Sequence, residues 1–193
     1  ADTIPAFVNY VEGIYVGYKF YETAAAEGLI DYDKTVVYPF GRGLSYTTFT
    51  QSLNSVTEAD GTITVDVTVT NTGSASGKEV VEVYYNPPYT NGGIEKASAN
   101  LIGFAKTSEL APGASENVTV TFKAEDMASY DTYGKGCYVL EKGDYVISIN
   151  ADSHTVLDSK VYNVASDIVY DASNKRESDV EVADNKFDFA EGN

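Results

Sequence analysis

The sequence has little of what disulfides, metal centres and histidine-based catalytic sites require. Its 193 residues include one Cys, one His, one Met and no Trp. The single Cys137 excludes an internal disulfide and any thiolate metal cluster within the chain. The single His154 likewise excludes a His-rich metal site or a pair of catalytic histidines. We therefore expect neither a metal nor a cofactor.

Basic residues are also scarce, with 13 Lys and Arg against 29 Asp and Glu and a net charge of -16. Nucleic acid needs clustered positive charge, so it is excluded as a partner. The same charge disfavours an anionic membrane surface. No apolar stretch approaches the roughly 18 residues that span a bilayer. The sequence predicts a soluble protein without a visible signal peptide, and it leaves the compartment, cytoplasmic or secreted, open.

What the sequence does contain is alternation of apolar and polar residues between about residues 46 and 165. The period of two is clear over 63–70, 118–123 and 145–150, as expected for half-buried strands. Turn residues separate these segments. Further strand-like segments are residues 79–85, 100–106, 137–140 and 154–164. Six to eight short strands in about 120 residues predict an all-β fold, an antiparallel β-sandwich of fibronectin type III or immunoglobulin type.

The two ends of the chain differ from this central part. Residues 1–45 are rich in Tyr and Phe without a regular period, and only 22–28 is typical of a short helix, ended by Gly28. Such a segment cannot bury itself, so we expect it to pack against another surface. Residues 166–193 are acidic and poor in apolar residues. They predict a solvated linker or arm, of which Val180, Val182 and Phe187/Phe189 contact a neighbour.

Motifs for chemistry are weak. His154 lies in a polar turn, which indicates a surface residue rather than a general base. Acidic pairs such as Asp126 with Asp131, or Asp152 with Asp158, lack the ligand spacing of a calcium loop.

A sugar-binding platform of aromatic side chains is a further hypothesis, formed by Tyr84, Tyr85 and Tyr89 around Pro87-Pro88. The alternative is that Tyr84 and Tyr85 belong to a strand while Tyr89 covers the loop.

Several ordered motifs resemble glycoside hydrolase family 3, the β-glucosidase and β-xylosidase family. Residues 12–22 (EGIYVGYKFYE) are similar to the family's exit from its second domain, and residues 38–49 (YPFGRGLSYTTF) to the start of its fibronectin-like domain. The motifs VTVTNTG at 67–73, LIGFAK at 101–106 and LAPG at 110–113 follow in the family's order. Together the matches span roughly residues 10–150.

The resemblance implies a parent enzyme that hydrolyses β-glycosides with retention. The family uses an Asp nucleophile on a TIM-like barrel and a Glu acid/base from the following α/β sandwich. The Ser-Asp pairs at 166–167 and 178–179 lack the aromatic residue of the family's nucleophile motif, so no catalytic residue is assigned. Residues 169–170 and 185–193 resemble the connector in members of permuted order, whose barrel follows the sandwich.

An interface role is expected for six residues of the leading segment, whose burial is worth about 1.5–3 kcal/mol per large side chain. They are Tyr15, Tyr18, Tyr21, Phe40, Leu44 and Tyr46. The alternative is that these side chains close one end of the sandwich.

The resulting hypothesis has three parts: residues 1–45 as a connector from a preceding α/β domain, 46–165 as the sandwich and 166–193 as an arm toward a following barrel. The chain is then a non-catalytic scaffold portion of a β-glucosidase-like enzyme. Its partners are the enzyme's catalytic domains, and it meets carbohydrate substrate only through them. The alternative is a freestanding carbohydrate-binding or adhesion module.

Overall fold

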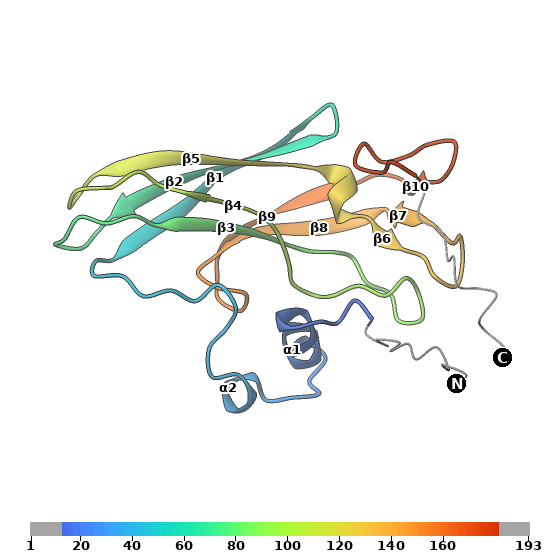
Figure 1. Cartoon of the computed structure of the whole chain (residues 1–193), viewed down its shortest axis with the longest axis horizontal. Helices are drawn as coiled ribbons and strands as arrows, with labels where there is room; N and C mark the ends of the chain where they lie inside the picture. The colour runs from blue at the N-terminus through green and yellow to red at the C-terminus, as the bar shows by residue number, and fades with distance from the viewer. Residues whose placement is uncertain (1–12, 182–193) are drawn as a thin grey trace, which may run out of the picture.

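The computed structural model describes residues 13–181 and shows two β-sheets packed face to face (Figure 1). One sheet has the order β1-β2-β5 and the other the order β4-β3-β8-β9, and all neighbouring strands are antiparallel. The first comprises β1 (Phe49–Ala59), β2 (Thr62–Asn71) and β5 (Ser115–Lys123). The second comprises β3 (Val80–Asn86), β4 (Asn100–Lys106), β8 (Gly143–Asn150) and β9 (Val156–Val164). The predicted all-β sandwich is confirmed.

Alternation in the sequence becomes burial in the structure. The apolar residues of β2 and the inward-facing apolar residues of β8 are fully enclosed between the sheets, while the Thr residues of β2 and Val146 of β8 are at least partly exposed. Each such aliphatic side chain contributes about 1.5–3 kcal/mol by leaving water. The enclosed set is Ile63, Val65, Val67 and Val69 on β2 with Tyr145, Ile147 and Ile149 on β8. The core of the sandwich is thus made by the strands that alternate most regularly.

Three β-bulges interrupt the pairing of the described strands, in β1, β4 and β9. In β1 the register shifts between Leu53 and Ser55, so the period of two breaks within a strand that the sequence did not reveal. In β4 the extra residue is Ile102, opposite the step from Val83 to Tyr84 of β3. Strand β3 itself keeps the period of two, so Tyr85 packs on the core beside Tyr145, whereas Tyr84 lies on the outer face of the sheet.

The leading segment is a pair of short helices beneath the outer face of the β4-β3-β8-β9 sheet (Figure 1). Helix α1 (Tyr18–Ala26) ends before Gly28, whose φ of 70° is the left-handed conformation usual after a helix. Helix α2 (Tyr32–Thr35) is capped by the Asp31 side chain. The predicted helix at 22–28 is present and begins four residues earlier. We call residues 13–48 the helical connector.

The trailing segment stays in contact with the sandwich beyond residue 165. A small third sheet has the order β10-β7-β6, built from β10 (Ile168–Tyr170), β7 (Tyr138–Leu140) and β6 (Ser129–Tyr130), and a 3-10 turn at Ala124–Met127 precedes it. The Arg176 guanidinium lies 3.7 Å from the centre of the Tyr138 ring and is paired with Asp179. Val182, Phe187 and Phe189 lie outside the described residues.

Within residues 13–181, no helix has the length and apolarity needed to cross a bilayer.

Candidate functional site

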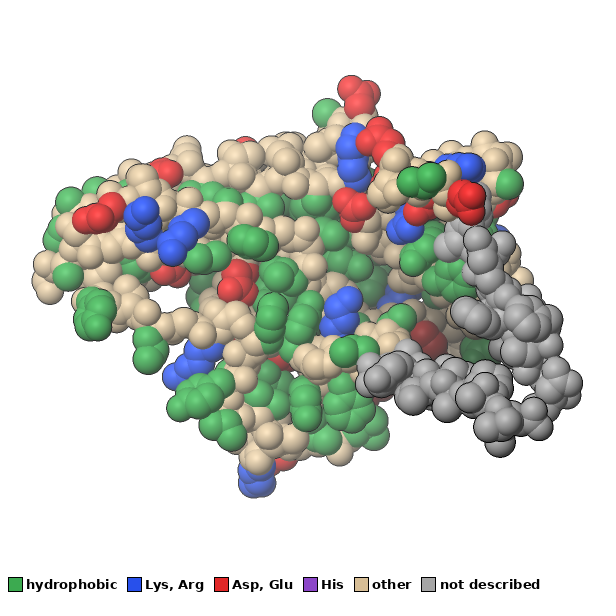
Figure 2. Space-filling view, in the orientation of Figure 1, with side chains coloured by type: hydrophobic (Ala, Val, Ile, Leu, Met, Phe, Trp, Pro, Cys, Tyr) green, Lys and Arg blue, Asp and Glu red, His purple; other side chains and the backbone are tan. Residues whose placement is uncertain are grey.

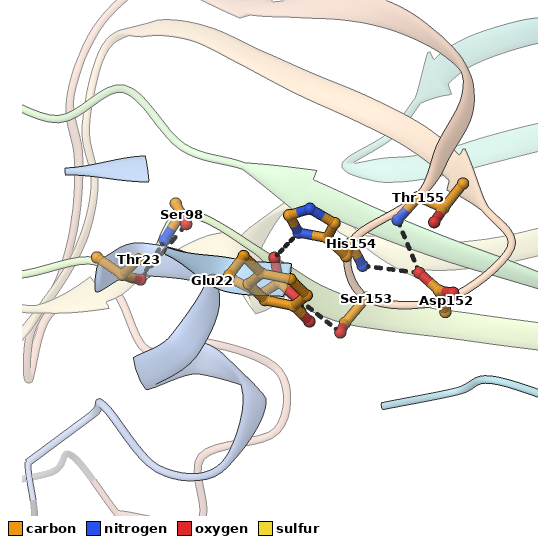
Figure 3. A network of polar contacts seen from close by, with 8 residues as sticks. Glu22, Thr23, Ser98, Asp152, Ser153, His154 and Thr155 are labelled. Carbon is orange, nitrogen blue, oxygen red and sulfur yellow. Dashed lines mark hydrogen bonds and ion pairs between the residues drawn. The ribbon is translucent and has the colours of Figure 1, made fainter. Parts of the chain in front are cut away.

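The helical connector is held to the sandwich by a buried carboxylate, Glu22 of α1 (Figure 3). The Tyr32 hydroxyl donates to Glu22 Oε1 over 2.6 Å, and the Ser153 hydroxyl donates to the same oxygen over 2.8 Å. The His154 Nδ1 lies 2.8 Å from Oε2. A buried charge is tolerated only when its lone pairs are satisfied, and here three partners from two distant segments do so. We call Glu22, Tyr32, Ser153 and His154 the connector clasp.

His154 belongs to the clasp and has no catalytic partner there. Its ring stacks on Tyr32 with centroids 3.6 Å apart, and its side chain is 42% exposed. Ser153 Oγ donates to Glu22 and not to the imidazole, so the nucleophile–base contact of a hydrolase is not formed. The predicted surface position of His154 is half right, because one edge of the ring is engaged by a buried carboxylate.

The acidic turns considered as calcium sites are occupied by their own backbone. Asp152 Oδ1 accepts from the N–H groups of His154 and Thr155, which fixes the turn that holds the clasp. Asp131 accepts from the N–H groups of Gly134 and Lys135. Within residues 13–181, no group of three His, Cys, Asp or Glu side chains has the geometry of a metal site.

Of the six residues predicted to dock a neighbouring domain, two are fixed against the sandwich of this chain. Tyr18 stacks on Phe40 at 4.7 Å, meets Tyr84 edge to face, and accepts a hydrogen bond from the Leu101 N–H. Burial raises the pKa of its hydroxyl. Tyr15 donates to Glu95 in the β3–β4 loop over 2.5 Å. These two side chains therefore position the connector.

The other four are exposed and remain available to a neighbour. The exposed fractions are 40% for Tyr21, 49% for Phe40, 95% for Leu44 and 102% for Tyr46. Four further apolar side chains that the sequence argument did not single out are exposed. Phe20 contacts Tyr21, Val37 and Tyr38 line a hollow together with Phe40, and Phe104 pairs across the strands with Glu82. Figure 2 shows apolar side chains gathered over the helical connector. We call these eight residues the docking face.

Gly41 allows the docking face to lie close to the sheet. Its φ is 86°, and a Cβ there would lie 2.4 Å from Glu82 Oε2. Glu82 itself accepts from the Tyr84 hydroxyl over 2.8 Å and pairs across the strands with Phe104. Burial, more than the nearby charge of Asp152, raises the pKa of the Glu82 carboxyl. The connector at Gly41 thus lies directly against Glu82 of β3, whose cross-strand neighbour is Phe104.

The sugar platform predicted from Tyr84, Tyr85 and Tyr89 is wrong. Tyr84 is 1% exposed beneath Tyr18, and Tyr85 packs on the core. Only Tyr89 is exposed, beside Glu95. Adjacent residues of a strand point to opposite faces of the sheet, so Tyr84 and Tyr85 do not share a surface with Tyr89.

The comparisons with known proteins agree with this architecture. A family model described as a fibronectin type III-like domain matches residues 79–153. Residues 79–153 are a fibronectin type III-like domain. The match covers β3 to the Ser153 turn, and the strands on either side complete the sandwich.

Relatives extend the match into the helical connector. β-Glucosidase A of Butyrivibrio fibrisolvens is 42% identical in an alignment 157 residues long, which covers 72% of this chain and 18% of the relative. A Kluyveromyces marxianus β-glucosidase is 33% identical over 86% of the chain and 20% of its own length. The solved β-glucosidase 3B of Thermotoga neapolitana, in complex with α-D-glucose, superimposes with a TM-score of 0.71 at 35% identity, covering 83% of this chain and 21% of that one.

The chain is thus homologous to one segment of family 3 β-glucosidases and spans about a fifth of their length. The Fn3-like domain is a non-catalytic part of such enzymes.

Proposed function

We propose that this chain serves as a scaffold in a family 3 glycoside hydrolase, where its docking face braces the enzyme's catalytic domains. The larger enzyme would hydrolyse terminal β-glucosides or related β-glycosides with retention. The observation that supports the proposal most is the exposure of Leu44 and Tyr46, at 95% and 102%. Large apolar side chains left fully in water on one face are typical of an interface.

The chemistry of the chain supports a scaffold rather than a catalyst. The most buried carboxylate of the described residues, Glu22, is saturated by three hydrogen-bond partners. Retaining hydrolysis needs two carboxyl groups about 5 Å apart across the glycosidic bond, one of them free to act as a nucleophile. Glu22 has no such freedom, because its oxygens hold the connector in place.

The position of the docking face favours the catalytic domains as its partner. Its residues come mostly from the helical connector, and in the relatives the matched segment is only about a fifth of the chain. Tyr15 and Tyr18 tie the connector to the sandwich. A domain that packs on the connector would therefore be held at a fixed angle to the sandwich. The order of the domains, with a barrel after residue 193, rests on the sequence resemblance.

The test removes the two most exposed side chains with Leu44→Ser and Tyr46→Ser. In the isolated chain we expect the melting temperature to stay within about 1 °C, because neither side chain is buried there. In the larger enzyme we expect it to fall by several degrees, with the catalytic activity retained below that temperature.

The matched control is Tyr133→Ser, which removes a tyrosine 97% exposed in the β6–β7 loop, away from the docking face. It should leave both melting temperatures unchanged. The proposal is contradicted if the two docking-face variants leave the larger enzyme as stable as Tyr133→Ser does.

A further inference from the structure

A groove runs between the helical connector and the outer face of the β4-β3-β8-β9 sheet. Its volume is about 580 Å³, within the range of small-molecule sites. Ala25, Ala26 and Ile30 line it from the connector, opposite Ser148 and Asn150 of β8. The connector clasp closes one end, since Glu22, Tyr32, Ser153 and His154 also line the groove.

Asn150 is the feature of the groove that lacks an explanation within the fold. The residue is 3% exposed, and its Oδ1 is enclosed without a hydrogen-bond partner anywhere in residues 13–181. Leaving a buried carbonyl oxygen unpaired costs free energy, so native structures rarely do so without a bound group. Asn150 lines the groove, and χ2 of Asn is a broad torsion, so the amide that carries this unpaired oxygen borders the space open to a ligand. We therefore expect a bound molecule to donate a hydrogen bond to Asn150 Oδ1.

The surroundings of Asn150 are neutral. No Lys or Arg lines the groove, and the Glu22 carboxylate is already saturated. Hydroxyl and amide groups of Ser148, Ser159 and Asn86 line the same space, next to apolar Val146 and Val156. Neutral donors and acceptors beside an apolar wall match a molecule that has hydroxyl groups on one edge and C–H groups on its face. An anion is disfavoured by the net charge of -16.

We propose that this groove binds a neutral saccharide of one or two sugar units, with a hydroxyl of the sugar donating to Oδ1 of Asn150. The site is separate from the docking face, none of whose residues line the groove. It is also separate from the rejected platform, since its ligand lies against β8 and α1 and not on the ring of Tyr89. The proposal does not depend on the scaffold function.

The single histidine provides a direct test in the isolated chain. His154 gives the only imidazole C–H resonances in an NMR spectrum, and its ring lines the groove. Titration with D-glucose and with cellobiose should shift these resonances and the amides of β8 in a saturable way at millimolar concentration. D-glucuronate, similar in size but anionic, should bind more weakly.

Two variants address the groove. Ser148→Val removes a hydroxyl and narrows the groove, and Asn150→Leu replaces the unpaired amide with an apolar group of similar size. Each should weaken cellobiose binding about tenfold or more, while the melting temperature of the unliganded Asn150→Leu chain stays equal or rises. Thr121→Val is the control, because it removes an exposed hydroxyl from β5 on the opposite sheet; it should leave binding unchanged.

Any of three results would overturn the proposal. One is the absence of saturable shifts with both sugars in the folded wild-type chain. Another is a crystal soaked in cellobiose that shows an ordered water only on Asn150. Shifts that persist unchanged in both folded groove variants would also place the sugar elsewhere and overturn it.

Discussion

The sandwich and the helical connector are each held in place by a different kind of interaction. Between the sheets, enclosed Val, Ile and Tyr side chains exclude water, and their packing is not directional. The connector has few enclosed apolar residues: Ala24 and Tyr32 are buried, while most of its large side chains face solvent. It is positioned instead by directional hydrogen bonds to Glu22 and Tyr18. The comparison teaches that the sandwich provides stability, whereas the connector provides a defined surface.

The largest effect is expected from a cavity in the core. Ile149→Ala removes a fully enclosed side chain of β8 and should cost about 3 kcal/mol of unfolding free energy, within the 2–5 kcal/mol usual for such truncations. Urea denaturation followed by circular dichroism measures it. Val161→Ala on β9, where the side chain is 61% exposed, should change the free energy by less than about 0.5 kcal/mol. Equal losses of unfolding free energy in the two variants would contradict the assignment of Ile149 to the core and of Val161 to the surface.

The next effect separates the connector from the sandwich. Glu22→Ala leaves the hydroxyls of Tyr32 and Ser153 without their acceptor, at a cost of about 2 kcal/mol. Because the clasp lies outside the core, amide exchange should quicken in α1 and α2 while β2 and β8 stay protected. Hydrogen exchange measured by mass spectrometry resolves these segments.

Glu22→Gln is the conservative partner of that experiment, since its amide oxygen still accepts from both hydroxyls, and it should restore most of the protection. Glu27→Ala serves as the control, because Glu27 is an exposed acidic residue at the C-terminal end of the same helix. If Glu22→Ala quickens exchange in the sandwich as much as in the helices, the two regions are one cooperative unit and the comparison above is wrong.

Which of these features the sequence predicts depends on how local their causes are. The strands β2, β5 and β8 follow from alternation, because side-chain direction in a strand repeats every two residues. A bulge breaks that repeat at Asn54, which hid β1. No local pattern marks a bulge.

The candidate site depends on contacts that are remote in sequence. Glu22 and His154 lie 132 positions apart, so nothing near either residue signals the clasp. Phe104 joins the docking face only because β4 places it opposite Glu82, beside Gly41. The available signal was a large aromatic residue at an outward position of a predicted strand, within the motif LIGFAK. The docking role of the six residues was predicted from the family resemblance. In the structure, two of them anchor the connector to the sandwich and four are exposed.

A smaller effect is expected where the trailing segment meets the sandwich. Arg176→Ala removes the guanidinium from the Tyr138 ring and from Asp179, which should cost about 1 kcal/mol. Exchange of the β10 amides should quicken, and that of β2 should not. Lys175→Ala is the matched control, because it removes a neighbouring exposed cation without a ring contact. Unchanged exchange in β10 would show that the β7 pairing alone holds this segment.

The smallest effect concerns Glu82, where the connector meets the sandwich. It is measured as the pH dependence of the melting temperature. Burial raises the pKa of Glu82 above its ordinary value of 4.5, so the folded state binds the proton more tightly than the unfolded state does. The contribution of Glu82 to stability is then complete below pH 4.5 and is lost as the pH rises through the folded pKa. Glu82→Gln stays neutral and keeps an acceptor for the Tyr84 hydroxyl, so it should melt with wild type at pH 4 and ~1–2 °C above it at pH 7. Solvent around the partly exposed carboxyl keeps this difference small. A Glu82→Gln variant less stable than wild type at pH 7 would show that the charge of Glu82 stabilises the contact with the connector.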